Sequence, residues 1–246
     1  MWVVADLDDD YIARMEDVLE TYEQPYDPQQ PVVCLDEKPV TLHADVRPTS
    51  PAQPGREARR DNEYERCGTA NIFCAVEPKA GRHFTFATPD RSGFEFAQIA
   101  VRLALAYPAA TTIHLVMDNL SSHRQNSLAA VFGDEMAAEV WNRFTVHYTP
   151  THGSWLNQAE IEIGIFTRQC LGKRRIPDLK TLWREAKAWK RRMNRDRVKI
   201  GWDFDRKTAR RKFGYRRQSF SRSKTSCAWP AQSDASGDLQ FGVWLQ

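Results

Sequence analysis

Residues 32–39 read Val-Val-Cys-Leu-Asp-Glu-Lys-Pro, and residues 112–119 read Thr-Ile-His-Leu-Val-Met-Asp-Asn. Each is an apolar run of the buried-strand type that ends in an acid, Asp36 or Asp118. Open α/β sheets bind ligands beyond the carboxyl ends of their strands, so two neighbouring strands of this kind would bring both carboxylates to one divalent metal ion such as Mg²⁺. Each acid could instead cap a following turn, and these two runs alone leave both interpretations open.

The rest of the chain supplies further strands and helices in a mixed order. Strands are also predicted at 69–76, 83–88 and 145–148, and helices at 8–22, 94–107, 127–144, 155–171 and 179–194. Three strands that hairpins can join come first, and strands separated by helices follow, which favours a mixed sheet over an all-parallel one. The sequence therefore predicts one α/β domain from about residue 30 to residue 200, with helices flanking the sheet.

Composition excludes several classes of protein. With 41% hydrophobic and 27% charged residues among 246, the chain is not a disordered segment, a collagen-like repeat or a disulfide miniprotein. The longest apolar stretch, Phe96 to Ala110, is interrupted by Arg102 and Pro108, so no segment is expected to span a bilayer. Five cysteines without a C-x-x-C pair are expected to be free thiols in a reducing cytoplasm rather than a zinc site.

The net charge of +3 conceals a strong asymmetry along the chain. Residues 1–30 contain nine acids and one base, whereas Arg168 to Lys224 contains 22 Lys and Arg against five Asp and Glu. A basic block of this size, interleaved with aromatic residues, is typical of a protein that binds a polyanion, and nucleic acid is the usual one. The alternative is a solvated helical face whose charge the acidic start balances.

A third carboxylate would strengthen the metal hypothesis, and the helix predicted at 155–171 offers Glu160 and Glu162. The apolar stripe of this helix includes Trp155, Ile163 and Cys170. Both acids border that stripe on a helical wheel, so periodicity alone does not choose between them.

Three blocks of the chain together resemble a known family. They are CLDEKP at 34–39, LVMDNLSSHR at 115–124 and HYTPTHGSWLNQAEIEIG at 147–164. In this order they are similar to the catalytic core of bacterial insertion-sequence transposases of the mariner-like superfamily, often called DDE superfamily endonucleases. The resemblance runs from about Trp2 to Arg222, and the last block is its most specific part.

The resemblance implies a ribonuclease-H-like fold in which three acids hold two Mg²⁺ (or Mn²⁺) ions for DNA strand cleavage and transfer. Carried over by position, Asp36 matches the first acid, Asp118 the second, and Glu160, within Leu-Asn-x-x-Glu, the third. The implied partners are double-stranded DNA, both transposon ends and target, and further copies of the chain in a homo-oligomer on that DNA. The resemblance implies neither a membrane nor a small-molecule substrate, and it places the protein in the bacterial cytoplasm, at the nucleoid.

Residues next to the acids receive secondary roles. Asn119 and His123 match family positions beside the second acid. His123 could orient a water or contact a phosphate, or it could satisfy a backbone carbonyl. Glu37 is expected to pair with Lys38 or with a loop arginine rather than with metal.

The predicted helix start at 152–157 has two interpretations. Ser154 is the expected N-cap, and a DNA contact through this end by His152 and Asn157 is the alternative. Further along the chain, phosphate contacts are expected from five basic residues, Lys173, Arg174, Arg175, Arg191 and Arg192.

The chain departs from its relatives in two respects. They carry a helix-turn-helix region before the core, whereas this sequence begins at about the point where that region ends. The 41 residues between Asp118 and Glu160 also exceed the usual mariner-like spacing, and the extra length fits the 133–139 segment. We expect an acidic helix and linker at 1–30, the catalytic domain at 31–200, and a basic extension at 201–246 with a disordered tail from Ser223.

Two competing hypotheses remain beside a transposase core. One is a truncated, non-catalytic regulator that binds DNA or a full-length partner, and the other is a host nuclease of the same fold. All three acids are present, which argues against simple catalytic decay.

Overall fold

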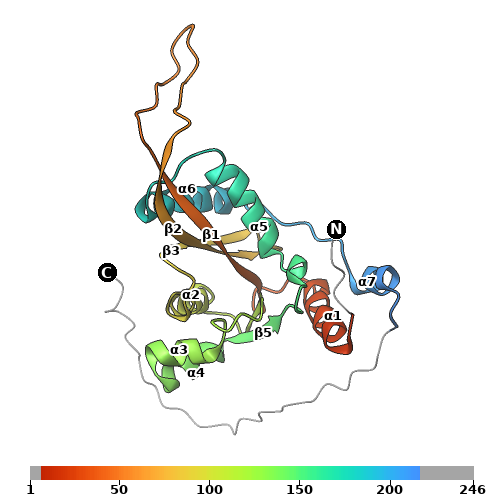
Figure 1. Ribbon diagram of the computed structural model, residues 1–246. Coiled ribbons are helices and arrows are strands. Elements are labelled where there is room, and N and C mark those ends of the chain that lie inside the picture. The colour runs from red at the N-terminus through yellow and green to blue at the C-terminus, as the bar shows by residue number, and fades with distance from the viewer. Residues whose placement is uncertain (1–6, 217–246) are drawn as a thin grey trace. The chain divides into compact units, whose positions relative to one another are not determined.

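The computed structural model describes residues 7–216 (Figure 1). The predicted tail from Ser223 lies outside the described residues. Within them the elements follow in this order: α1 (Asp9–Glu23), β1 (Val32–Asp45), β2 (Tyr64–Glu77), β3 (Arg82–Thr88), α2 (Gly93–Ala106), β4 (Ile113–Met117), α3 (Gln125–Phe132), α4 (Asp134–Trp141), β5 (Phe144–Tyr148), the short 3₁₀ helix η1 (Ser154–Leu156), α5 (Ala159–Phe166), the π-helical turn η2 (Thr167–Leu171), α6 (Leu179–Asp196) and α7 (Arg206–Phe213).

The five strands form one mixed sheet in the order β3-β2-β1-β4-β5. β1, β2 and β3 are antiparallel neighbours, whereas β4 and β5 run parallel to β1. Helices flank this sheet on both faces: α2, α3 and α4 pack on one face, and α1, α5 and α6 pack on the other. The predicted α/β, ribonuclease-H-like mixed sheet flanked by helices is confirmed.

The first strand is much longer than the four apolar residues that the sequence indicated. β1 continues through Asp36 to Asp45 because β2 pairs with it from Cys34 to Asp45, which lies opposite Tyr64. Pro39 is tolerated within β1 because β4 pairs only as far as Cys34, so that one side of the strand beyond this point is an open edge. The two strands continue into an arm, residues 46–63, that projects from the sheet (Figure 1).

Alternation along β1 assigns its side chains to the two faces of the sheet. Val33 and Leu35 pack in the core with α2, α3 and α4, and Cys34 packs on the opposite face with α1. Further along, Val40 joins a third cluster, built with α5 and α6. Asp36 lies two residues after Cys34 and therefore faces the same side of the sheet, towards α1 and α5. Glu37 faces the opposite side, towards α2.

Two predicted helices are broken in the structure. The helix expected at 127–144 is divided into α3 and α4 at Gly133, whose φ of +82° is readily adopted only by glycine. The helix expected at 155–171 consists of η1, α5 and η2. The division follows Asn157, whose Oδ1 accepts a hydrogen bond from the backbone N–H of Ala159 at 3.1 Å and so competes with regular helical bonding.

Part of the basic C-terminal segment pairs with the acidic start of the chain. Arg206 on α7 forms ion pairs with Glu20 and Glu23 of α1, and Arg210 pairs with Glu16. Each of these arginines lies on the face of α7 that also buries Ala209. The alternative interpretation, in which the acidic start balances the basic block, thus holds for Arg206 and Arg210 of α7.

No helix among residues 7–216 is both long and apolar enough to cross a membrane.

Candidate active site

The register between β1 and β4 sets the positions of the two strand acids. Val32 pairs with His114 and Cys34 with Val116, and pairing then stops. Asp36 and Asp118 each lie two positions beyond that last pair, so they stand at the same level on adjacent parallel strands, which are about 4.8 Å apart. The sheet thus brings the two acids to one edge, as expected for ligands of an open α/β sheet.

Asp36 is held on the α5 side of the sheet by Asn157. The Asn157 side-chain amide donates to the carbonyl oxygen of Leu35 at 2.8 Å and lies 3.5 Å from Asp36 Oδ2, while Asp36 Oδ1 accepts from the Glu37 N–H at 2.8 Å. Burial raises the pKa of Asp36 to about 7, and the negative charge of Glu160, with those of Glu37 and Asp118, adds to this effect. Asp36 therefore lies in a region of excess negative charge.

The structure distinguishes the two acids of α5. Glu160 is exposed, and it is the strongest charged neighbour of Asp36. Glu162 is fully buried, and its Oε1 lies 2.7 Å from Nδ1 of His83 on β3. Glu162 is thus part of the core between α5 and β3, whereas Glu160 faces the same edge as Asp36.

Asp118 begins a chain of charged groups whose middle members, His123 and Glu37, are buried. His123 Nδ1 lies 2.6 Å from Asp118 Oδ1, and His123 Nε2 lies 3.5 Å from Glu37 Oε2. Arg91, in the loop before α2, is 3.7 Å from the other oxygen of Glu37, which is the expected loop arginine. The ring nitrogens of His123 therefore face two carboxylates and not a backbone carbonyl.

The charges in this chain stabilise one another. Burial disfavours the charged ring, but the hydrogen bond with Asp118 and the charges of Glu37 and Asp118 outweigh it and raise the pKa of His123. For Asp118, burial is likewise outweighed by the hydrogen bond and charge of His123, and the pKa of this carboxyl is lowered. Burial raises the pKa of Glu37, although the charge of His123 opposes the rise. The contact therefore favours the ionised form of Asp118 and the protonated form of His123.

Other residues predicted near the site lie at its margin. Asn119 is exposed and accepts a hydrogen bond from Arg124 at 3.4 Å. His152 is exposed, with a φ of +61°. The expected N-cap role of Ser154 is wrong, because Ser154 is the first residue of η1 and makes no side-chain cap hydrogen bond. The buried polar residue at this helix start is Asn157.

The oxygen donors of the site suit a hard divalent cation, although they do not surround one as they stand. Among residues 7–216, no three His, Cys, Asp or Glu side chains are grouped closely enough to hold a metal ion. Uncompensated carboxylates repel one another, and this repulsion adds to burial in raising the pKa of Asp36. Three carboxylates from β1, the end of β4 and α5 are a donor set that fits Mg²⁺ or Mn²⁺. Their convergence on a cation stays a prediction.

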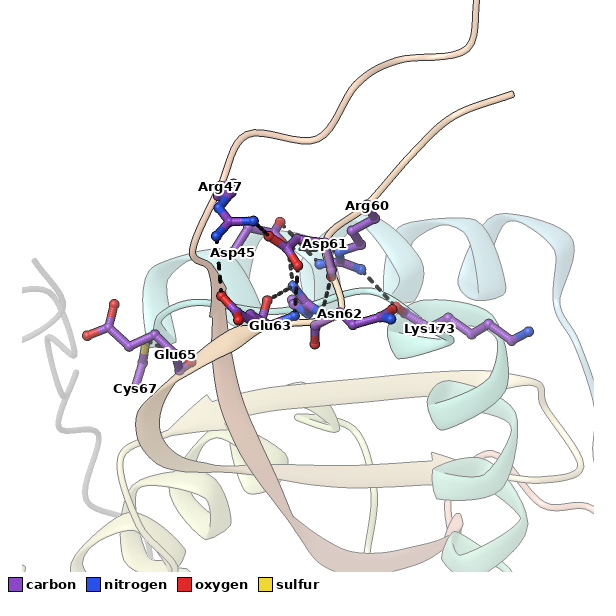
Figure 2. A network of polar contacts seen from close by, with 10 residues as sticks. Asp45, Arg47, Arg60, Asp61, Asn62, Glu63, Glu65, Cys67 and Lys173 are labelled. Carbon is purple, nitrogen blue, oxygen red and sulfur yellow. Dashed lines mark hydrogen bonds and ion pairs between the residues drawn. The ribbon is translucent and has the colours of Figure 1, made fainter. Parts of the chain in front are cut away.

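The five predicted phosphate contacts occupy different environments. Arg175 donates to Asp45 at 2.6 Å and to the carbonyl oxygens of Asp61, Asn62 and Glu63, so it ties the base of the arm together. Arg60 bridges Asp45 and the carbonyl oxygen of Lys173 in the same network (Figure 2).

The other predicted contacts are more open. Arg174 pairs with Glu185, and Arg192 donates to Gln169. The side chains of Lys173 and Arg191 are exposed, and they make no ion pair within the described part of the chain. These environments set Arg175 apart as an internal brace of the arm.

Sequence reasoning missed two features of the site. The pair of His83 and Glu162 joins residues 79 apart, and no local pattern indicates it. The place of Glu37 on the α2 face, by contrast, was accessible from strand alternation once β1 is extended past Asp36.

Comparison with known proteins gives a family match and distant structural neighbours. No curated protein matches the chain. Among solved structures, the chain is similar to the Mos1 mariner paired end complex with Mn, at 15% identity and a TM-score of 0.44 over 80% of this chain and 64% of that one. It is also similar to the Mos1 strand transfer complex, at 14% identity and a TM-score of 0.46 over 82% and 66%.

A third neighbour is the catalytic domain of Mos1 mariner transposase, with 12% identity, a TM-score of 0.42, and coverage of 82% of this chain and 100% of that one. Similarity this distant carries no conclusion about activity. The family described as DDE superfamily endonuclease, in contrast, matches residues 31–183, which include β1, β4, α5 and all three acids. Because that match spans well over half of the sequence, the chain belongs to the DDE superfamily endonuclease family.

Proposed function

We propose that the chain is the catalytic core of an insertion-sequence transposase, which cleaves DNA strands and joins them to a target in a metal-dependent reaction. Membership of the DDE superfamily endonuclease family supports the nuclease chemistry. The observation that carries the proposal is the electrostatic grouping of Asp36 with Asp118 and Glu160, three acids contributed by separate elements.

The three carboxylates would act as the ligands of two Mg²⁺ or Mn²⁺ ions. When bound, such ions activate a water or hydroxyl nucleophile and stabilise the leaving oxygen of a phosphodiester. In a first step water would attack the phosphorus and break its bond to O3′, which leaves a 5′-phosphate and a free 3′-hydroxyl group. In a second step that hydroxyl would attack a target phosphodiester, forming a new phosphodiester bond and displacing a 3′-hydroxyl group of the target strand. No protein nucleophile is required, so the protein contributes alignment and charge placement.

The neighbouring side chains have defined positioning roles in this proposal. His123 engages one oxygen of Asp118 and leaves the other available as a ligand. Asn157 fixes β1 to the start of α5 and thereby fixes the separation of Asp36 and Glu160. Positioning of this kind is needed because small displacements of ligands cost large factors in rate.

The remaining features of the proposal concern partners and organisation. Double-stranded DNA would supply both transposon ends and target, and a homo-oligomer on that DNA would bring two ends together. Residues 31–200 would form the catalytic domain, between an acidic N-terminal segment, 1–30, and a basic C-terminal extension, 201–246.

The test is incubation of the purified 246-residue chain with supercoiled plasmid and Mg²⁺ or Mn²⁺. We expect nicking by the wild type, its loss in Asp36→Asn, Asp118→Asn and Glu160→Gln, and wild-type nicking by Glu135→Gln, an exposed acid on α4 that serves as the matched control. Mn²⁺ binding followed by electron paramagnetic resonance should weaken in the same three variants.

Two outcomes would contradict the proposal. DNA binding without nicking would indicate a non-catalytic regulator of transposition. Nicking that persists in Asp118→Asn would place the chemistry elsewhere in the chain.

A further inference from the structure

Within residues 168–216, the two helices of the basic block, α6 and α7, have different electrostatic environments. In α7, Arg206 and Arg210 are committed to Glu16, Glu20 and Glu23 of α1. Helix α6 contains seven basic residues and only two acidic ones, Glu185 and Asp196. Two of the five basic residues of α7 are therefore paired with α1, whereas five of the seven on α6 form no ion pair among residues 7–216.

Helix α6 has one buried and one exposed side. Leu182, Ala186, Trp189 and Met193 are buried against the sheet. The opposite side has an exposed basic or aromatic residue at each turn, and we call it the α6 face: Lys180, Trp183, Arg184, Lys187, Arg191 and Arg195. At 1.5 Å per residue it is about 22 Å long, the length of about six base pairs of DNA.

Most cations of the α6 face lack an acidic partner. Arg184 and Arg195 pair with the neighbouring Glu185 and Asp196. Within residues 7–216, Lys180, Lys187 and Arg191 form no ion pair. Beside the face, burial lowers the pKa of Lys190, and the charges of Lys187 and Arg102 lower it further. Such crowding of like charge favours an anionic partner.

Trp183 adds a second signal. Its side chain is 51% exposed, and Lys187 Nζ lies 4.6 Å from the centre of its ring. An exposed aromatic ring among free cations is the combination by which proteins contact nucleic-acid backbones and unpaired bases. Each other described tryptophan is at least partly buried.

We infer that the α6 face is the surface through which this chain binds the phosphodiester backbone of DNA, and that Arg206 and Arg210 of α7 instead brace that helix on α1. The inference rests on the proposed function only in taking DNA as the partner. Phosphate contacts carry no sequence information, so binding through this face should be insensitive to sequence.

The test compares two double variants of the full chain that remove the same amount of charge. Lys187→Gln with Arg191→Gln should weaken binding to a random 20-base-pair duplex by about tenfold at 0.1 M salt. It should also make the slope of log K against log salt shallower by about 1.8, since each lost contact accounts for about 0.9. Arg206→Gln with Arg210→Gln should change affinity less than about threefold and should lower the melting temperature. The change in tryptophan emission on adding duplex should disappear in Trp183→Phe.

Equal loss of affinity in both double variants would overturn the inference, because net charge alone would then explain binding. Equally tight, α6-dependent binding to phosphatidylserine vesicles would also overturn it. Duplex binding that depends on α6 without any nicking that depends on Asp118 would leave this inference standing and remove the proposed function. Nicking that depends on Asp118, together with DNA binding that does not depend on α6, would remove this inference and leave the proposed function standing.

Discussion

His83 and Glu162 form a fully buried pair between β3 and α5, with Nδ1 and Oε1 2.7 Å apart. The other ring nitrogen, Nε2, lies 2.8 Å from the carbonyl oxygen of Val198, which can only accept, so Nε2 carries a proton. The imidazole and the carboxylate must then share one further proton or form an ion pair. This contact fixes the orientation of α5 about its own axis. It thereby also fixes the direction of the Glu160 side chain, which lies two residues earlier on the same helix.

The first prediction separates the hydrogen bond of this pair from its charge. In Glu162→Gln the amide can donate to the unprotonated Nδ1 of a neutral His83, and we expect a loss of no more than about 1 kcal/mol in the free energy of unfolding. Glu162→Leu leaves Nδ1 of the ring without a partner in the core and should cost about 3 kcal/mol. Urea unfolding measures both values, and equal costs would show that the pair does not stabilise α5.

The second prediction concerns Asn157, whose amide satisfies the buried carbonyl of Leu35. Asn157→Ala removes that donor and the acceptor for the Ala159 N–H, so the free energy of unfolding should fall by about 2 kcal/mol. Asn119→Ala is the matched control, because Asn119 is exposed and its loss should change stability by less than about 0.5 kcal/mol. Similar values for the two variants would contradict the role given to Asn157.

The third prediction uses the close approach of Gly81 to the segment after α6. Gly81 has a φ of +64°, and a Cβ there would lie 2.6 Å from the carbonyl carbon and oxygen of Arg197. Gly81→Ala should therefore cost at least about 3 kcal/mol and lower the melting temperature by about 6 to 12 °C. Gly201→Ala, where no atom lies within 4 Å, should leave it nearly unchanged. A melting temperature of Gly81→Ala near that of the wild type would contradict the observed packing.

The sequence predicted where the strands of the sheet lie better than it predicted how long they are. Apolar runs such as 113–117 are local signals, and β4 forms where they indicated it. The extension of β1 to Asp45 depends on its pairing with β2, which is not visible in the alternation of either strand alone. Gly133 was a readable helix break, because a glycine between two helical segments commonly adopts a positive φ.

The sequence predicted the acids of the candidate site but not the contacts that support them. Asp36 and Asp118 follow from strand ends, and only the family resemblance selected Glu160. The exclusion of Glu162 depends on His83, a residue on another strand, and the shielding of Asp118 depends on the folding back of His123. Contacts of this kind arise from packing of distant segments, for which periodicity within one element carries no information.

The last prediction is a pH dependence that arises from Glu77, a buried carboxyl at the end of β2. Glu77 is 3% exposed at the end of β2, and its Oε2 accepts a hydrogen bond from the Tyr107 hydroxyl at 2.9 Å. Burial raises the pKa of this carboxyl above its usual 4.5, although the Tyr107 hydrogen bond and the charge of Arg82 oppose the rise. The folded state therefore binds the proton more tightly than the unfolded state does.

The sign of the effect follows from linkage. A raised pKa contributes stability that is fully present below pH 4.5 and is lost as the pH rises through the folded-state pKa. Glu77→Gln keeps an acceptor for Tyr107 and does not titrate. Its free energy of unfolding should therefore rise relative to that of the wild type as the pH increases from 4 to 7.5. Urea unfolding at both pH values measures this difference, with the exposed Glu135→Gln as the control that should show none. A difference between wild type and Glu77→Gln that stays constant with pH would mean that Glu77 ionises as freely in the folded protein as in the unfolded chain.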